Sequence, residues 1–192
     1  MITMKDVIRE GHPNLNKVSD PVKIPLSNED KKLLVDLFTY VKHSTDEAML
    51  EKYDLRPSVG IAAPQVNVLK RMFAIHVHDV DGTLYSYMIV NPTIKQKSSN
   101  LIYLPGGEGC LSVDRETEGL TPRHESITLE ALRYINETDT LSPITLHLHG
   151  YIGIVFQHEF DHLNGILYTQ KLFLDLPSAK PAFELTQVEN DG

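Results

Sequence analysis

The segment YIGIVFQHEFDHLNG, residues 151–165, decides the fold of this chain. It is dense in apolar residues at helical spacing, and it ends in Asn164–Gly165, a pair typical of a helix C-terminus. The same segment contains His158, Glu159 and His162. Polar side chains in so apolar a helix are costly to bury without partners. The segment therefore predicts a buried helix with a polar site on it.

Two further helices are expected near the start of the chain. Residues 28–43 have apolar side chains at the spacing of an amphipathic helix, and residues 46–53 form a shorter pattern of the same kind. Two pairs have the spacing of a capping box at a helix start: Ser27 with Asp30, and Ser44 with Glu47.

The middle of the chain changes to the alternating pattern of β-strands. Apolar residues alternate at Phe73, Ile75 and Val77, and SYMIVNP, residues 86–92, is a short apolar run that we expect to stop at Pro92. Asp81–Gly82 between these runs is typical of a hairpin turn. Further strands are expected at residues 93–103, 111–113, 126–134 and 144–149.

This order of elements predicts an α+β fold, with N-terminal helices, antiparallel strands and a buried helix that contains an H-E-x-x-H pattern. The chain has no internal repeat or change of composition, so a single domain spanning residues 1–192 is expected. The tail after Lys171 contains Pro177 and Pro181, and we expect it to be loose or extended.

Composition and charge disfavour several classes of protein. The chain has 192 residues, a net charge of −8 and a pI near 5.5, which disfavour a nucleic-acid partner. The N-terminus lacks an apolar segment of secretory type, and no apolar run approaches the roughly 18 residues that cross a bilayer. A single cysteine, Cys110, rules out an internal disulfide. These features predict a soluble cytoplasmic protein.

The five residues from His158 to His162 form the H-E-x-x-H pattern. Histidines at positions i and i+4 of a helix lie one turn apart on one face, so both imidazoles reach one metal ion. Glu159 begins one residue further on, where it can contact a water bound to the ion without ligating the ion itself. The pattern therefore predicts the site of a divalent-metal hydrolase.

Four other histidines form two His-x-His pairs, His76/His78 and His147/His149. Each pair lies on an expected strand whose alternate residues are apolar. We therefore expect these four side chains to face solvent and not to bind a metal.

The third protein ligand has more than one candidate. Metzincin enzymes extend the pattern with a third histidine, but Tyr168 stands at that position here. Thermolysin-like enzymes use a glutamate from a following helix, and Glu184 follows at a distance, yet Pro177 and Pro181 disfavour a helix there. Cys110 lies in GEGCLS, residues 107–112, and a thiolate is an excellent ligand for a borderline-soft ion. Cys110 is the strongest of these candidates.

Three segments in this order resemble the signature motifs of the peptide deformylase family. They are VGIAAPQ at residues 59–65, EGCLS at residues 108–112 and HEFDH at residues 158–162. The opening MITMKDVIREGHPNL also resembles the Gram-positive (type II) branch of that family. The resemblance implies a hydrolase that removes the formyl group from the N-terminal methionine of newly synthesised polypeptides and releases formate.

The resemblance also implies roles for individual residues. The metal ligands would be Cys110, His158 and His162, with Glu159 as the catalytic acid and base. Gln65 and the backbone N–H of Leu111 would stabilise the developing oxyanion. The implied cofactor is one divalent ion per chain, Fe²⁺ in the cell, with Zn²⁺, Ni²⁺ or Co²⁺ able to replace it.

A peptide-binding cleft is implied as well. Its expected lining residues are Val59, Gly60 and Gly109, with Val59, Ile154 and Val155 around the methionine side chain and Tyr151 closing one side. The chain departs from the family at Ser58, where glycine is usual, and Pro57 precedes this serine. Arg123 resembles an arginine that the family has near its site.

The expected partners follow from this activity. They are nascent peptides that begin with formyl-methionine, with transient proximity to the ribosome, no membrane and no sequence-specific nucleic-acid contact. Two other functions compete with it: a zinc endopeptidase, and an inactive homologue that acts as a binding module. Release of formate from a formyl-methionine peptide discriminates among the three.

Overall fold

The computed structural model describes residues 1–185. Its helices are α1 (Asn28–His43), α2 (Glu47–Tyr53) and α3 (Gly150–Leu163). Its strands are β1 (Gly60–Ala62), β2 (Met72–His78), β3 (Leu84–Lys97), β4 (Leu101–Tyr103), β5 (Arg123–His124), β6 (Ser126–Ile135), β7 (Thr140–His149) and β8 (Ala179–Pro181). Short 3₁₀ turns lie at Pro13–Asn16, Ala63–Val66, Asn136–Thr138 and Tyr168–Lys171. The predicted α+β class is confirmed.

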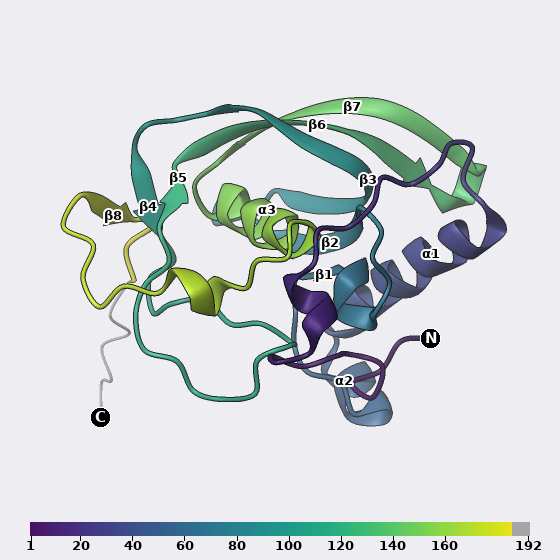
Figure 1. The fold of residues 1–192 in the computed structure, drawn as a ribbon, viewed down its shortest axis with the longest axis horizontal. Helices are drawn as coiled ribbons and strands as arrows, with labels where there is room; N and C mark the ends of the chain where they lie inside the picture. The colour runs from purple at the N-terminus through teal and green to yellow at the C-terminus, as the bar shows by residue number, and fades with distance from the viewer. Residues whose placement is uncertain (186–192) are drawn as a thin grey trace.

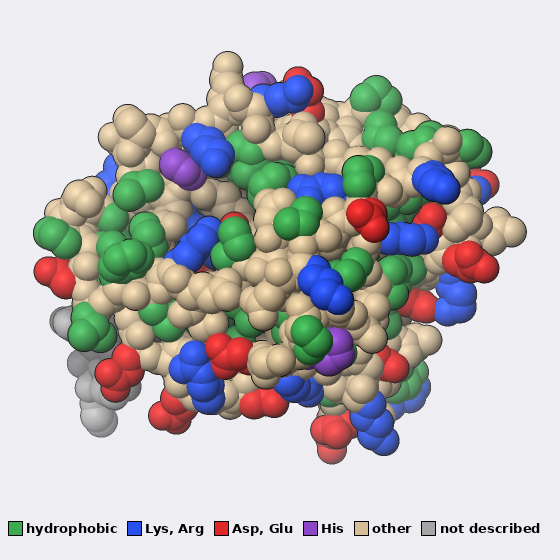
Figure 2. Space-filling model, in the orientation of Figure 1, with side chains coloured by type: hydrophobic (Ala, Val, Ile, Leu, Met, Phe, Trp, Pro, Cys, Tyr) green, Lys and Arg blue, Asp and Glu red, His purple; other side chains and the backbone are tan. Residues whose placement is uncertain are grey.

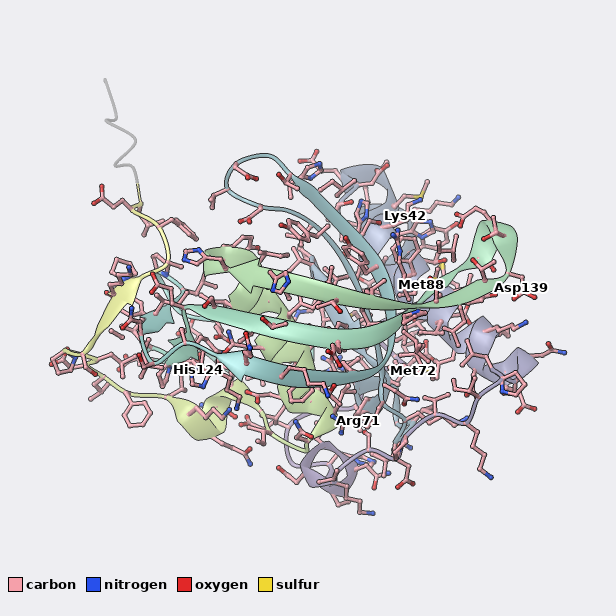
Figure 3. The ribbon with its side chains drawn as sticks, turned by 90° about the horizontal axis from the view of Figure 1, so that it is seen from above. Lys42, Arg71, Met72, Met88, His124 and Asp139 are labelled. Atoms are coloured by element: carbon pink, nitrogen blue, oxygen red, sulfur yellow. The ribbon has the colours of Figure 1, made fainter. Side chains whose placement is uncertain are left out.

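The strands form two sheets within the described residues. The larger sheet is antiparallel, with the order β1-β2-β3-β6-β7, and the smaller sheet has the order β5-β4-β8 with β4 and β8 parallel. Figure 1 shows the small sheet at one end of α3 and α1 toward the other end of the molecule. In Figure 3, His124 of β5 and Asp139, between β6 and β7, lie toward these opposite ends.

Strand β2 has apolar side chains on both faces, and each face packs into a different core. Met72 and Ala74 belong to the core beneath α1, which includes Leu34 and Leu37 of that helix. Phe73, Ile75 and Val77 point the other way, into a second core that includes Ile152, Val155 and Phe156 of α3. Successive side chains of a strand face opposite sides, so the large sheet lies between α1 and α3.

Helix α3 is the buried helix that the sequence predicts. Ten of its fourteen residues are buried, and it contacts β1, β2, β6 and β7 of the large sheet and β5 of the small one. Asn164 caps the C-terminus of the helix, and Gly165 follows with φ 71°, a left-handed conformation that suits glycine. An added Cβ at Gly165 would lie 2.6 Å from the backbone carbon of Asn16, so this turn also packs tightly.

The predicted N-terminal cap of α1 is confirmed, and that of α2 is wrong. The Ser27 hydroxyl accepts a hydrogen bond from the Asp30 N–H at 3.1 Å and caps α1. Ser44, in contrast, is the C-terminal cap of α1, and its hydroxyl contacts the carbonyls of Val41 and Ser58. Asp46 caps α2 instead, because its carboxylate accepts from two N–H groups of the first turn.

Three strand predictions need correction. Strand β3 does not stop at Pro92 but runs to Lys97. Its pairing with β6 shifts register between Val90 and Thr93, so the strand continues past Pro92 although proline has no N–H to donate. Residues 93–103 are divided between β3 and β4, which belong to different sheets. Residues 111–113 form a turn, closed by the Val113 N–H donating to the Cys110 carbonyl at 3.1 Å.

Two further predictions, that four histidines face solvent and that the tail is loose or extended, are confirmed only in part. His78, His147 and His149 are exposed as predicted, but His76 is half-buried, bonds Ser86 at 3.0 Å and packs edge-on against Phe38. The tail is extended in part, since β8 pairs with β4, whereas residues 186–192 lie outside the described residues.

Charged side chains of both signs are interspersed over the face shown in Figure 2. Among the helices of residues 1–185, none combines the length and the apolar character required to cross a membrane.

Candidate metal centre

Three potential metal ligands from two parts of the chain meet beside α3. The ligand atoms of Cys110, His158 and His162 all lie within 4.8 Å of one another. Cys110 Sγ is 3.4 Å from His162 Nε2, and the imidazole centroids of the two histidines are 5.0 Å apart. A thiolate and two imidazoles at this spacing are a donor set that suits Zn²⁺ or Fe²⁺.

Glu108 orients one of the two imidazoles. Its Oε2 is 2.8 Å from His158 Nδ1, so the Nε2 of that ring is left to bind a metal ion. Tyr168, which stands where metzincins have a third histidine, stacks on the His158 ring at a centroid distance of 6.0 Å. The tyrosine therefore packs beside the site and does not replace the missing ligand.

A buried arginine holds Glu108 in place. Arg123 donates from Nε and Nη2 to the two Glu108 oxygens at 2.8 and 2.9 Å, and from Nη1 to Asp161 at 2.5 Å. Burial alone would raise the pKa of Glu108, but hydrogen bonds from Arg123 and His158 lower it to about 2. Glu108 is therefore ionised and accepts the His158 proton throughout the physiological range.

The electrostatics of the two histidines fit a bound cation. Burial lowers the pKa of His162 well below its usual range, so this imidazole is neutral, as a ligand must be. Burial would also lower the pKa of His158, but Cys110 and Glu108 raise it well above its usual range. The Glu108 carboxylate, which favours a proton on His158, also favours a metal cation among the three donors.

Glu159 lies beside these donors with one oxygen available. Its side chain is buried, and within residues 1–185 its Oε2 has no hydrogen-bond partner. Burial raises its pKa to about 7, a value suited to taking up and returning a proton. Gly60 packs directly against the carboxylate, because a Cβ there would lie 2.5 Å from Glu159 Oε1.

Gln65 is fixed with its amide nitrogen toward the thiol. Its Oε1 accepts from the Ala62 N–H at 2.9 Å, which leaves Nε2 to face Cys110 Sγ at 3.4 Å and Ser112 Oγ at 3.3 Å. The carboxamide therefore presents a donor to the region beside the metal ligands.

One cleft of about 350 Å³ is lined by Gln65, Glu108, Cys110, His158 and Glu159, whereas His162 does not line it. The predicted substrate-binding residues line it too: Val59, Gly60, Gly109, Tyr151, Ile154 and Val155. Leu111, a predicted oxyanion donor, is also among the lining residues. At Gly109, however, an added Cβ would meet no atom of the described residues within 4 Å, so packing within the chain does not explain that glycine.

Sequence reasoning missed several residues of the cleft and its support. Arg56 and Leu104 line it, and Glu108, read only as part of a glycine-rich motif, orients a predicted ligand. Arg123 does not line the cleft, and acts through Glu108 and Asp161. Glu108 and Arg123 lie 15 residues apart in sequence, and no local pattern shows that they form a buried ion pair.

The comparisons with known proteins agree on one family. A family profile described as Polypeptide deformylase matches residues 4–175. The chain is 51% identical to a peptide deformylase of Oceanobacillus iheyensis over 92% of this chain and 94% of that one. It is 52% identical to peptide deformylase 2 of Geobacillus stearothermophilus over 90% of this chain and 91% of that one.

Solved structures show the same likeness. A class I type b peptide deformylase from Acinetobacter baumannii, bound to Met-Ala-Ser, superposes with a TM-score of 0.64 and 28% identity, over 86% of this chain and 96% of that one. The peptide deformylase of Thermus thermophilus gives a TM-score of 0.65 and 29% identity, over 88% of this chain and 85% of that one. The chain therefore belongs to the peptide deformylase family, in its Gram-positive (type II) branch.

Proposed function

We propose that this chain is a metal-dependent peptide deformylase, which hydrolyses the N-formyl group of an N-terminal methionine and releases formate. The observation that carries this proposal is that one cleft is lined by Cys110, His158, Glu159 and Gln65. The ligand atom of His162 lies within 4.8 Å of those of Cys110 and His158. The family to which the chain belongs supports the same reaction.

In this proposal Cys110, His158 and His162 hold one divalent ion. Such an ion lowers the pKa of a water and polarises a carbonyl oxygen. Fe²⁺ is the expected ion in the cell, and Zn²⁺, Ni²⁺ or Co²⁺ would fit the same donors.

Glu159 is the proton carrier in this scheme. Its unpartnered Oε2 takes a proton from the water that attacks the formyl carbon, and returns it to the amine nitrogen as the C–N bond breaks. The pKa of about 7 that burial produces suits both steps.

Gln65 and Leu111 are the proposed oxyanion donors. The Gln65 Nε2 and the backbone N–H of Leu111 would donate to the formyl oxygen as negative charge develops on it. One such donor typically contributes roughly 3 kcal/mol to the transition state. The hydrogen bond from Ala62 to Gln65 Oε1 fixes the amide beforehand, so no reorientation is needed during the reaction.

The substrate we propose is a nascent peptide with formyl-methionine at its start. Val59, Ile154 and Val155 supply apolar surface for the methionine side chain, and Tyr151 closes one side of the cleft. The Acinetobacter structure supports this choice, because that protein binds Met-Ala-Ser.

The proposed setting is the cytoplasm, with transient proximity to the ribosome and without sequence-specific nucleic-acid binding. The net charge of −8 supports the last point, since like charges repel a nucleic acid. One domain over residues 1–192 stays a prediction.

Three alanine variants test the proposed roles of the H-E-x-x-H residues. Glu159→Ala should keep about one metal ion per chain and lose most formate release from formyl-Met-Ala-Ser, because Glu159 moves a proton and does not ligate. His158→Ala and His162→Ala should lose both metal and activity. Metal analysis and a formate assay on the same samples measure both quantities. An empty site in Glu159→Ala would contradict these roles.

A further inference from the structure

Strand β1 is an edge strand whose free side faces the cleft. It is the first strand in the order β1-β2-β3-β6-β7, and Val59 and Gly60 line the cleft. The His76 N–H donates to the Val59 carbonyl at 3.0 Å, and Gly60 stands opposite Ile75. Backbone groups of an antiparallel strand alternate in direction, so Val59 and Ile61 face β2 while Gly60 and Ala62 face away from it.

Two side chains already contact this free side. The Ala62 N–H donates to Gln65 Oε1 at 2.9 Å, as described above. The Gly60 carbonyl accepts from the Ser58 hydroxyl at 2.6 Å. Ser58 thus bonds the backbone group that points from β1 toward the cleft.

Ser58 is itself held by the end of α1. The buried Ser44 hydroxyl contacts the Ser58 carbonyl at 2.6 Å and accepts from the Ser58 N–H at 3.2 Å. A chain of hydroxyl contacts therefore runs from Ser44 through Ser58 to Gly60.

The backbone before β1 is also restricted. Pro57 fixes its own φ and disfavours helical conformations at Arg56. Ser58 does not have a left-handed backbone, so its side chain fits without strain, whereas the glycine usual in this family would leave the backbone freer.

We propose that Ser58 is a positioning residue for substrate, which holds the Gly60 carbonyl in the direction needed to pair with an extended peptide. This inference rests on the proposed function, since it takes the peptide substrate from it. The pairing is the addition of a peptide strand to a sheet edge.

The Ser58 hydroxyl need not compete with the peptide. A carbonyl oxygen has two lone pairs, so Gly60 can accept from Ser58 and from a peptide N–H together. Orienting the carbonyl beforehand reduces the entropy lost when the peptide binds, which improves affinity. The Ser58 hydroxyl donates to the Gly60 carbonyl and not to a metal ligand, so the chemical step should be unaffected.

The test compares Ser58→Ala and Ser58→Thr in the nickel-loaded protein. Loss of one such hydrogen bond should raise KM for formyl-Met-Ala-Ser roughly threefold to tenfold in Ser58→Ala, with kcat unchanged. Binding of the product Met-Ala-Ser, followed by calorimetry, should weaken by a similar factor. Ser58→Thr keeps the hydroxyl and should restore both values. Ser142→Ala, on β7, is the matched control.

The possible results separate this inference from the proposed function. An active wild type whose KM and product affinity are unchanged, or improved, in Ser58→Ala overturns the role of Ser58 alone. A fall in kcat without a change in KM also overturns it. A wild type that binds Met-Ala-Ser through Ser58 but releases no formate overturns the proposed function alone. A wild type that neither binds nor reacts overturns both.

Discussion

Cys110 is the residue on which the metal assignment depends most, because no third histidine is available at Tyr168. It is the only cysteine of the chain, so any thiol labelling reports on it alone. A sulfur bound to a metal is shielded from alkylation. Native metal-loaded protein should therefore react slowly with a thiol reagent, and should react quickly once a chelator is added. Rapid labelling of the loaded protein would show that Cys110 is not a ligand.

Gly60 is the residue whose size matters most for Glu159. An alanine Cβ would lie 2.5 Å from Glu159 Oε1 and 2.8 Å from its Cδ, so the buried carboxylate would have to move. Misplacement of a catalytic group by this amount typically lowers rate by roughly 10- to 100-fold. Gly60→Ala should therefore lose kcat by about that factor in a formate assay and keep its metal.

Gly109→Ala is the matched control for that experiment. It lines the same cleft, but its added Cβ would meet no atom of the described residues within 4 Å. Its kcat should fall less than that of Gly60→Ala. Equal values of kcat in the two variants would mean that the contact with Glu159 is unimportant.

At the scale of elements, Arg123 joins three segments. It lies in β5, and bonds Glu108 in the loop before Cys110 and Asp161 in α3. Removing one partner of a buried ion pair typically costs about 3–5 kcal/mol. Arg123→Ala should lower the free energy of unfolding by about that amount, measured by urea unfolding of chelator-treated protein so that metal affinity does not contribute.

Lys171 provides the control, because it pairs with the same carboxylate from a more exposed position. Its Nζ is 2.8 Å from Asp161 Oδ2, and its side chain is 36% exposed. Exposed pairs contribute little, so Lys171→Ala should change the free energy of unfolding by less than about 1 kcal/mol. Similar losses in the two variants would contradict a special role for the buried cluster.

Elements with a strong local pattern could be predicted from sequence, and those fixed by distant contacts could not. The pattern at residues 28–43 gives α1, and the apolar segment at 151–165 gives α3. Residues 111–113 look like a strand, but the Glu10 N–H bonds the Ser112 carbonyl at 2.7 Å and satisfies the backbone without a sheet. The N-terminal segment that supplies this bond is about 100 residues away in sequence.

At the scale of the whole molecule, the pairing of distant strands into sheets could not be predicted from the sequence either. Strand β4 pairs with β8, and residues 101 and 179 form one register pair. Both strands have three residues, too few for a periodic pattern to reveal them. The site is the opposite case. Its donor residues lie in short segments whose chemistry can be recognised, although the Glu108–Arg123 support depends on the fold.

The central claim is that the protein hydrolyses formyl groups in this cleft, and a comparison of formyl with acetyl peptides tests it most directly. A formyl carbon has only hydrogen where an acetyl carbon has a methyl. In a closely packed site an extra methyl typically costs 1–3 kcal/mol, or roughly 10- to 200-fold in rate. Gly60 against Glu159, and Gln65 against Cys110, show such packing at the metal ligands.

Nickel-loaded protein is incubated separately with formyl-Met-Ala-Ser, acetyl-Met-Ala-Ser and unblocked Met-Ala-Ser. The release of formate, acetate and new amines is then followed. The account predicts rapid release of formate, acetate release at least about tenfold slower, and no cleavage of internal peptide bonds. Comparable rates on the formyl and acetyl peptides, or steady cleavage of the unblocked peptide, would contradict a deformylase and favour a zinc endopeptidase.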